Sequence, residues 1–413
     1  LNDPDQLRKY FISHSIDTLI MVPWLDYDHY NPTSDIFLTR QTYFNEFFVA
    51  IEKIRAVSKN IKLVGAIQSN LYTPSLKVQR IIIQHLEQEG IKSGFQKIPI
   101  NLLSEKLILP RKINELVVDE TGNVPVEVYF NGPNNIIGVA LATAVTERSS
   151  QLFFLNNQID FLVNKVGLDG FYIDQLSLAF NSKNPQRYDF GKWDGRTIVL
   201  NEKIEDKYTF INDLALSTIK AKKKLLEQSL DRGLIIVANT PPATETMAEL
   251  PIPRFFEAFW HGIDYFNDPD GKPPAWSSIM ATRLSTPLGL LAPNWMKQFM
   301  DQDFLFSNLI YNLKNGIIPV YNGSASVKKY IMLPNFFPGT FRNVGEGFVL
   351  SDYKLIAAKT MNIPIANKTI EKVKFFDKSG LILENKARRA FIKDGLLQIF
   401  LDDWSEIVEV QFK

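Results

Sequence analysis

The chain has 413 residues, of which 45% are hydrophobic and 22% charged, an ordinary globular composition with room for one large barrel plus a smaller domain, or for two to three ordinary domains. Its 46 basic and 45 acidic residues give a formal net charge of +1 without a long Lys or Arg block, so nucleic acid is not an expected partner. The absence of cysteine excludes disulfides and thiolate metal sites, and four scattered histidines give no metal-site spacing, so a metal is not expected. An organic cofactor is not expected either.

No apolar run approaches the roughly 20 residues that a helix needs to cross a bilayer, and no signal peptide precedes the first expected element. The chain begins with Leu rather than Met, which suggests a processed or trimmed chain. We therefore expect no membrane span and an extracellular or secreted location, with a cytoplasmic location left open. The sequence does not indicate the oligomeric state.

Up to about residue 320, predicted strands and helices alternate, which is the pattern of a (β/α)8 TIM barrel. Strands are expected at residues 18–24, 62–67, 126–130, 170–173, 233–239, 254–260, 288–291 and 317–321. Helices are expected at about residues 41–57, 78–86, 156–166, 210–230 and 297–314, and a polar, aromatic loop at residues 181–196. Residues 71–124 are too many for a simple crossover, so we predict a barrel domain over residues 1–323 with an insertion at 71–124.

Beyond residue 324 the pattern changes to short runs that often alternate between apolar and polar residues. Such runs fall at residues 370–376, 381–383, 389–392, 397–400 and 407–412. Turn signals at residues 378–380 and 393–395 separate some of them. The pattern predicts a small C-terminal domain over residues 324–413, an antiparallel β-sandwich.

The most informative motif is Leu-Asp-Gly-Phe-Tyr-Ile-Asp-Gln at residues 168–175, in which Asp174 directly follows a short apolar run. A helical pattern that ends in Gly167 precedes it, so the segment reads as the αβ unit of a parallel sheet. A barrel carries its site at the C-terminal ends of its strands, which makes Asp174 a candidate catalytic acid. The alternative is a strand-end residue that caps the next turn. Asp169 is expected to bond locally where the strand begins.

The other predicted strand ends carry carboxylates, amides and aromatic residues. They are Trp24, Asp26, Asp28, Gln68, Asn70, Asn131, Gln175, Asn239, Glu257, Trp260 and Tyr321. Amides and carboxylates hydrogen-bond to hydroxyl groups, aromatic faces pack on pyranose rings, and two carboxylates share the work of glycoside cleavage. The set is therefore the one expected of a protein that holds a sugar.

Three short motifs carry a family resemblance. Residues 23–32, Pro-Trp-Leu-Asp-Tyr-Asp-His-Tyr-Asn-Pro, form an aromatic and acidic loop after an early strand, and residues 168–176 contain Asp174. Residues 255–260, Phe-Phe-Glu-Ala-Phe-Trp, contain Glu257. In this order the motifs resemble retaining (β/α)8-barrel glycoside hydrolases that act on α-linked sugars, and most nearly the dextranase and cycloisomaltooligosaccharide glucanotransferase family. That family has Leu-Trp directly after the Glu, whereas Ala-Phe-Trp follows Glu257 here.

The resemblance implies that Asp174 is the nucleophile and Glu257 the general acid/base of a retaining double displacement. The apolar neighbours of Glu257 favour a raised pKa, as an acid requires, because desolvation disfavours its charged form. An ion pair with Arg254 or Arg283 would instead make Glu257 a structural carboxylate.

The alternative acid/base residues are Glu245 and Glu249, which follow the strand that ends at Asn239. A helix start with acids in its first turn explains these two residues as well. The candidate substrate-binding residues are Trp24, Asp26, Asp28, His29, Asn70, Gln175, Trp193, Asn239, Trp260 and Tyr321. Burial in the core, or at a contact between domains, is an equal alternative for the tryptophans.

The sequence therefore predicts an enzyme, a glycoside hydrolase that cleaves α-glycosidic bonds of an oligo- or polysaccharide, with carbohydrate as its partner. A transglycosylase would use the same residues and differ in what resolves the intermediate. The alternative from another class is a non-catalytic carbohydrate-binding barrel or surface protein.

Overall fold

The computed structural model describes most of the chain in separate stretches. They are residues 3–13, 16–21, 40–90, 94–103, 108, 110–130, 136–177, 187–200, 208–240, 242, 244–256, 287–290, 309–310, 312–320, 342–365, 367–377, 380–384, 389–403 and 405–413. Contacts divide the chain into two compact units. Unit 1 comprises Leu1 and Asp17–Ile252, and unit 2 comprises Asn2–Ile16 and Pro253–Lys413. The described chain is a mixed α/β structure.

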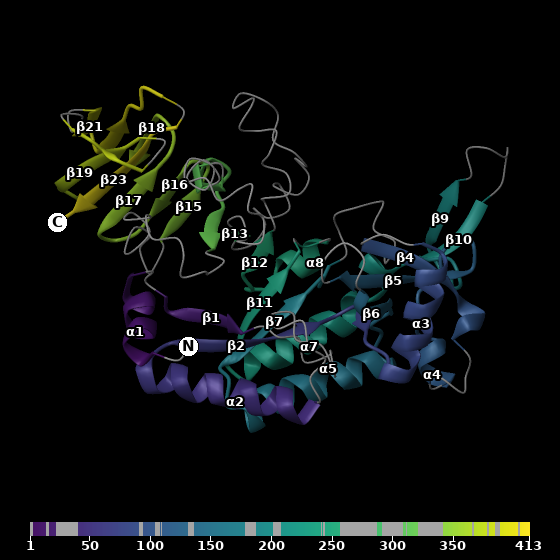
Figure 1. The fold of residues 1–413 in the computed structure, drawn as a ribbon. Coiled ribbons are helices and arrows are strands. Elements are labelled where there is room, and N and C mark those ends of the chain that lie inside the picture. Colours follow the sequence, from purple (N-terminus) through teal and green to yellow (C-terminus); the bar gives the residue numbers. More distant parts are fainter. Residues whose placement is uncertain are drawn as a thin grey trace. The chain divides into compact units, whose positions relative to one another are not determined.

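A parallel sheet forms the centre of unit 1 (Figure 1). Its strands lie in the order β1 (Thr18–Met21), β2 (Lys62–Gln68), β7 (Gly170–Asp174) and β11 (Ile235–Asn239). Nearly all residues of β2 and every residue of β7 are buried, which is typical of parallel strands covered on both faces. The strands predicted at residues 62–67, 170–173 and 233–239 are thus confirmed.

Helices precede or follow these strands in the chain. They are α2 (Arg40–Val57), α5 (Ser150–Asp160), the π-helical turn η2 (Phe161–Lys165), α6 (Leu214–Ser217), α7 (Ile219–Asp231) and α8 (Glu245–Ala248). Of these, α5 and α7 pack against the sheet (Figure 1). Ser149 caps α5, because its side chain accepts a hydrogen bond from the Leu152 amide. Gly167, with a φ of +76°, then turns the chain from the helix toward β7.

The insertion forms an antiparallel sheet of its own. Its strands lie in the order β3 (Leu71–Tyr72), β6 (Ile136–Ala142), β5 (Asn123–Phe130) and β4 (Gly94–Pro99). The helical segments α3 (Leu76–Gln88), η1 (Ile100–Leu102) and α4 (Pro110–Ile113) accompany it. Val78, Ile82 and Leu86 of α3 share a core with the apolar side chains of β5 and β6.

The assignment of residues 126–130 to the third barrel strand is wrong. These residues belong to β5, which pairs antiparallel with both β4 and β6. Val124, Val126 and Val128 are buried in alternation, as in a strand with one face on a core. A strand's composition predicts its type, whereas its partner and direction depend on residues far along the chain.

A second antiparallel sheet in unit 1 lies between β7 and α7 in the sequence. Its order is β8 (Tyr188–Asp189), β10 (Tyr208–Asp213) and β9 (Thr197–Leu200). The loop predicted at residues 181–196 therefore contains a strand, and the helix predicted from residue 210 begins later, at α6. The run Tyr-Thr-Phe-Ile at residues 208–211 is rich in β-formers, and it pairs with β9 instead of continuing the helix.

Unit 2 contains parallel strands and two antiparallel sheets. Strands β12 (Arg254–Phe256), β13 (Pro287–Leu290) and β14 (Ile318–Val320) pair in parallel, as predicted for their segments. Helix α1 (Pro4–Ser13) also belongs to this unit. Of the helix predicted at residues 297–314, residues 309–310 and 312–314 are described and helical.

The C-terminal strands form two antiparallel sheets, in agreement with the expected change to antiparallel β-structure. The larger has the order β15 (Asn343–Gly345), β16 (Phe348–Leu350), β17 (Lys354–Ala357), β23 (Ile407–Phe412), β19 (Ile370–Phe376) and β20 (Ile382–Leu383). The smaller has the order β18 (Met361–Pro364), β22 (Leu396–Ile399) and β21 (Ala390–Lys393). Leu355 and Phe375 of the larger sheet share one core with Ile363 and Leu397 of the smaller.

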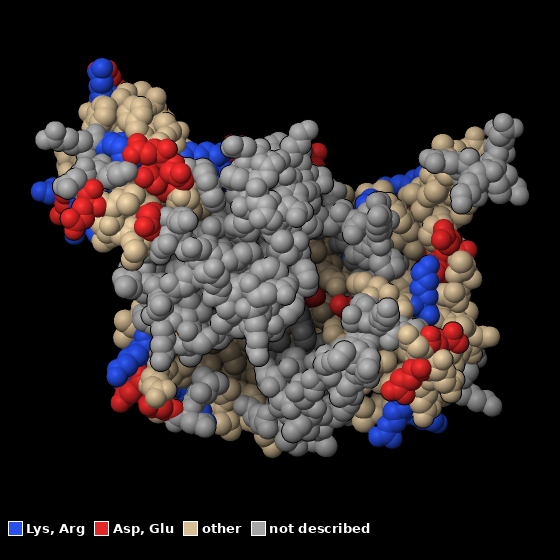
Figure 2. Space-filling model, turned by 45° about the horizontal axis from the view of Figure 1, so that its top comes forward, with Lys and Arg blue, Asp and Glu red and all other residues tan. Residues whose placement is uncertain are grey.

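Charged side chains of both signs are interspersed over the described part of the face in Figure 2, and no basic area stands out there. None of the described helices is both long enough and apolar enough to span a bilayer.

Candidate active site

Three neighbouring parallel strands end in polar residues at the same edge of the sheet. Gln68 ends β2, Asp174 ends β7 and Asn239 ends β11. Gln68 is the direct register partner of Asp174. The strands approach closely at Gly170, where a Cβ atom would lie 1.9 Å from the carbonyl oxygen of Ile235. The carboxyl edge of a parallel sheet is where α/β proteins bind ligands, so these side chains define the candidate site.

Both carboxylate oxygens of Asp174 accept hydrogen bonds, although the residue is only 8% exposed. Gln68 Nε2 donates to Oδ2 at 2.8 Å, and Asn239 Nδ2 donates to Oδ1 at 2.5 Å. The hydroxyl of Tyr172, two residues earlier on the same strand face, donates to Oδ1 at 3.3 Å. All three donors are neutral, and no described cationic side chain forms an ion pair with Asp174.

Burial raises the pKa of Asp174 above its ordinary value. The hydrogen bonds from Asn239, Gln68, Tyr172 and the Gln175 amide favour the charged form, but burial has the larger effect. The sequence analysis predicted a raised pKa for Glu257, the expected acid, and an ionised carboxylate at Asp174. The described site thus contains a carboxyl group whose ionised form depends on neutral amides from two neighbouring strands.

The backbone is strained directly after two of these strands. Gln175 follows β7 with a φ of +49°, and Thr240 follows β11 with a φ of +74°. A positive φ is rare for a β-branched residue such as Thr240, and strain of this kind clusters at functional sites. The two turns are joined, because the Ser177 amide donates to Thr240 Oγ1 at 2.9 Å and the Leu176 amide donates to the Asn239 carbonyl at 3.2 Å.

Residues behind the edge hold the backbone of Asp174 in place. Ser69 Oγ donates to the Asp174 carbonyl at 2.8 Å, and Asn70 Nδ2 donates to the Gln175 carbonyl. The buried Lys222 ammonium of α7 donates to the Leu176 carbonyl at 2.7 Å. Asn70 was predicted to bind substrate, but its side-chain amide nitrogen donates a hydrogen bond to the protein backbone.

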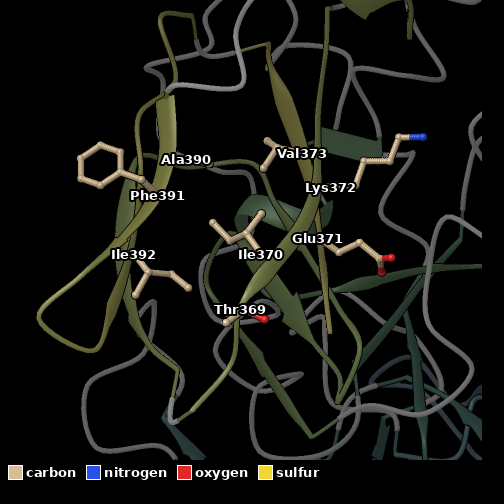
Figure 3. A pocket seen from close by; sticks show the side chains of 8 residues that line it. All are labelled: Thr369, Ile370, Glu371, Lys372, Val373, Ala390, Phe391 and Ile392. Carbon is tan, nitrogen blue, oxygen red and sulfur yellow. The ribbon is translucent and has the colours of Figure 1, made fainter.

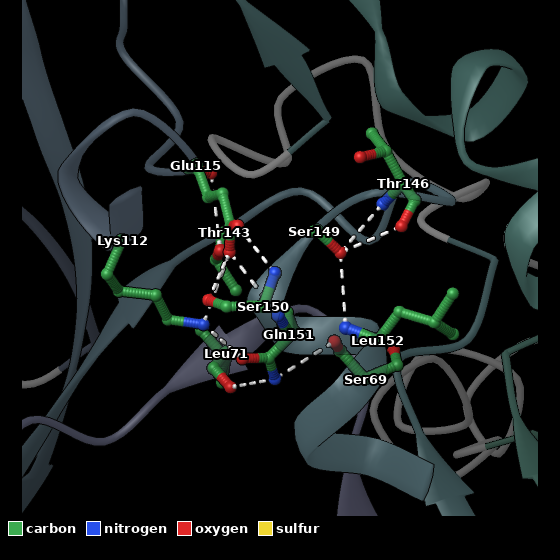
Figure 4. A network of polar contacts seen from close by, with 10 residues as sticks. All are labelled: Ser69, Leu71, Lys112, Glu115, Thr143, Thr146, Ser149, Ser150, Gln151 and Leu152. Atoms are coloured by element: carbon green, nitrogen blue, oxygen red, sulfur yellow. Dashed lines mark hydrogen bonds and ion pairs between the residues drawn. The ribbon is translucent and has the colours of Figure 1, made fainter. Parts of the chain in front are cut away.

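A buried polar network connects the insertion and helix α5 to this edge (Figure 4). The Glu115 carboxylate accepts hydrogen bonds from the backbone amides of Ser150 at 2.5 Å and Gln151 at 3.3 Å. Lys112 Nζ donates to Gln151 Oε1 at 2.6 Å. Gln151 Nε2 donates to the Leu71 carbonyl at 3.0 Å and to the Ser69 carbonyl at 3.5 Å. The network thereby contacts the same residue, Ser69, that holds the Asp174 backbone.

Sequence reasoning did not find this network or the contact between Gln68 and Asp174. The position of Gln68 gave a usable signal, because it ends its strand as Asp174 ends β7. No local signal points to Glu115 or Gln151, since their partners come from other parts of the chain.

The predicted site residues have different outcomes. Asp174, Asn239, Gln175 and Asn70 are brought together at one edge. The residues that lie outside the described stretches are Trp24, Asp26, Asp28, His29, Asn131, Glu257, Trp260, Arg283 and Tyr321. Arg254, a proposed ion-pair partner of Glu257, is fully buried in β12, and burial lowers its pKa to about 10.

The alternative acids Glu245 and Glu249 are both exposed; Glu245 begins the short helix α8, and Glu249 is the residue directly after it. The Thr244 side chain caps this helix by accepting a hydrogen bond from the Met247 amide, and Glu245 lies in its first turn. This placement fits the helix-start interpretation of Glu245.

Trp193 contacts the β9–β10 hairpin, and Asp169 precedes β7, at the opposite end of the strand from Asp174. Trp193 is 55% exposed, and its ring packs edge-on against Phe210 at a centroid distance of 5.0 Å. Asp169 precedes β7, accepts a hydrogen bond from the Leu63 amide at 2.9 Å and pairs with Lys62 at 3.1 Å. The expectation that Asp169 bonds locally at the start of the strand is confirmed.

A pocket of about 480 Å³ lies in unit 2, between the C-terminal sheets (Figure 3). Thr369–Val373 and Ala390–Ile392 line it, and Glu371 is its single carboxylate. It therefore lacks the pair of carboxylates that glycoside cleavage needs. Among the described residues, no group of three or more His, Asp or Glu side chains is placed to hold a metal ion.

No model of a known protein family matches the chain, and no curated protein matches it. The comparison with solved structures found several that are similar to this chain. One is the GH31 dextranase of Flavobacterium johnsoniae, with a TM-score of 0.42, 10% identity, and coverage of 99% of this chain and 50% of that one. Another is Amy13B of Eubacterium rectale, with a TM-score of 0.45, 9% identity, and coverage of 99% and 90%.

A third similar structure is the α-N-acetylgalactosaminidase NagBb of Bifidobacterium bifidum, with a TM-score of 0.40, 11% identity, and coverage of 80% of this chain and 43% of that one. The chain spans 63% of the cyclic α-maltosyl-(1→6)-maltose hydrolase of Arthrobacter globiformis, at a TM-score of 0.38 and 12% identity over 78% of this chain. It therefore covers less than two thirds of the length of several of the proteins that it resembles.

Proposed function

We propose that this protein is a glycoside hydrolase that cleaves α-glycosidic bonds of an oligo- or polysaccharide by a retaining double displacement. Asp174 is its nucleophile and Glu257 its general acid/base. The observation that carries the proposal is the Asp174 carboxylate, which ends a buried parallel strand and is held on both oxygens by amides of the two flanking strands. The three sequence motifs that resemble retaining glycosidases support the same assignment.

The contacts of Asp174 suit a nucleophile. Attack on an anomeric carbon needs a carboxylate that is ionised and fixed in direction. Gln68 and Asn239 donate to opposite oxygens, which limits rotation of the group and stabilises its charge. Among the described residues no cation pairs with Asp174, so neutral donors alone stabilise its charged form against the burial that raises its pKa.

We also propose that the parallel strands belong to a barrel of the (β/α)8 type over residues 1–323. The insertion, predicted at about 71–124, then extends to Ala142, because β5 and β6 pair within its antiparallel sheet. Residues 324–413 then form a β-sandwich. In such a barrel Asp174 and Asn239 lie on the catalytic rim. A double displacement between two carboxylates needs no metal or organic cofactor.

The test is a screen of α-linked oligosaccharides, polysaccharides and aryl glycosides with the wild type, Asp174→Asn and Glu257→Gln. The change at Asp174 is nearly isosteric. The buried side-chain oxygen of Gln68, which has no hydrogen-bond partner among the described residues, can accept from the new amide once the Gln68 amide turns. We expect an α-linked substrate to be cleaved by the wild type and by neither variant. Activity that survives in Asp174→Asn would refute the assignment.

Product analysis then separates the remaining mechanisms. NMR of the first product should show the α-anomer, as retention requires, whereas the β-anomer would indicate inversion. New glycosidic linkages would identify a transglycosylase. Glycan binding without turnover would favour the alternative, a non-catalytic carbohydrate-binding protein.

A further inference from the structure

The hairpin of β9 and β10 in unit 1 carries an apolar face that no described residue covers. Ile198 pairs with Phe210 and Leu200 pairs with Tyr208, so these four side chains share one face. They are between 49% and 66% exposed. Trp193 contacts Phe210 and extends the same surface. We call these five residues the hairpin face.

The outer part of this hairpin is a two-stranded ribbon. The third strand of the sheet, β8, pairs only with Asn212 and Asp213 of β10. The hairpin projects from the other sheets of unit 1 (Figure 1). An isolated two-stranded ribbon is marginally stable in water, and the largest apolar patch on a monomer is often functional. We therefore expect another apolar surface to bind and cover the hairpin face.

The chemistry of the face favours an apolar protein surface over a glycan. Ile198, Leu200 and Phe210 offer no hydrogen bonds, and the Tyr208 hydroxyl and the Trp193 indole N–H are the two polar groups among the five side chains. Glycan sites combine aromatic rings with several amides or carboxylates. Asp213 is the single charged residue of the two strands, and it is buried and paired with Arg187 at 2.9 Å.

A second copy of the chain satisfies these requirements. Two-fold pairing brings a surface onto itself, and this face has no exposed charge to repel its own copy. β9 is also an edge strand, which can pair with the same strand of a second chain. The three aromatic rings each leave about half of roughly 200 Å² in water, so with both aliphatic side chains the face offers on the order of 500 Å². Two copies would bury about 1,000 Å², the lower limit of a stable interface.

We propose that the hairpin face is the interface through which two copies of this chain associate. This inference is independent of the proposed glycosidase activity.

Sedimentation velocity of the full chain over a concentration series tests it. We expect reversible dimerisation of the wild type, and an increase of at least tenfold in the dissociation constant for Leu200→Glu. The matched control is Phe153→Glu, an equally exposed apolar residue on α5, which should leave the constant unchanged. A wild type that stays monomeric throughout the series, or two variants that weaken the dimer equally, would overturn the proposal.

Cross-linking gives a second readout that does not depend on destabilising the face. The chain has no cysteine, so Ile198→Cys and Phe153→Cys each carry a single thiol. A short bis-maleimide should link Ile198→Cys into a covalent dimer at concentrations where Phe153→Cys stays monomeric. Equal yields from the two variants would contradict the interface. Added polysaccharide that dissociates the wild-type dimer would show that glycan is the true occupant, which also refutes the proposal.

Discussion

Asp169 precedes strand β7 and Asp174 ends it, and the two carboxylates have opposite surroundings. Asp169 is partly exposed and pairs with Lys62 at 3.1 Å and with Arg55 at 3.7 Å. Asp174 is buried, receives only neutral donors, and has its pKa raised by burial. The first arrangement neutralises a charge and fixes a strand. The second leaves a buried carboxyl group without a cationic partner, which lowers the stability of the folded state. Such an arrangement is expected where the carboxyl group takes part in catalysis.

The largest expected effect separates the two carboxylates by activity. Asp174→Asn should lower kcat/KM by roughly 10³-fold or more, because the nucleophile is lost. Asp169→Asn should change it by less than about threefold, and its exposed ion pairs are worth about 1 kcal/mol or less. Kinetics on the substrate found in the screen, with urea denaturation of both variants, measure the difference. Equal losses of activity in the two variants would show that Asp174 has no catalytic role distinct from that of Asp169.

The next effect concerns the contacts that hold each end of strand β7. Gln151→Ala should lower the free energy of unfolding by about 1–3 kcal/mol, because it removes buried hydrogen bonds to the Leu71 carbonyl and from the Lys112 ammonium, which keeps its ion pair with Glu115. At the start of β7, Arg55→Met removes a partly exposed ion pair with Asp169 and a hydrogen bond to the Gly167 carbonyl, and should cost about 1 kcal/mol. Urea denaturation measures both. A larger loss for Arg55→Met would reverse the comparison.

The stability of the wild type should depend on the ionisation of Asp174. Its folded pKa is raised, so its contribution is fully present below the unfolded pKa of about 3.9 and is lost as the pH rises through the folded pKa. Each unit of rise corresponds to about 1.4 kcal/mol. Asp174→Asn should therefore gain stability relative to the wild type across that window. Denaturation at a series of pH values measures this gain, and a constant difference would show that burial does not dominate.

The smallest effect is expected from Tyr172→Phe. Its hydrogen bond to Asp174 is long, at 3.3 Å, so its loss should cost about 0.5–1 kcal/mol. Because that bond favours the charged carboxylate, its loss should move the acid limb of the pH–rate profile to higher pH. The profile of kcat/KM against pH measures the shift. A movement to lower pH would mean that the hydroxyl does not donate to Asp174.

Much of the local structure could be predicted from the sequence. The short, β-rich runs before Gln68, Asp174 and Asn239 predicted buried strands with polar ends, because a continuous apolar run is needed where both faces of a strand are covered. The helix before β7 was marked by its periodicity and by Gly167. Residues 126–130 and 208–213 were misplaced, because strand composition does not specify a partner or a direction.

The sequence by itself determined that a carboxylate ends a buried strand, since that depends on a few neighbouring residues. Only the tertiary structure decided what surrounds it. Gln68 lies 106 residues before Asp174 and Asn239 lies 65 after it, and parallel pairing alone makes them its hydrogen-bond partners. Burial by that pairing also sets the direction of its pKa shift. These properties arise from long-range packing, which no local pattern encodes.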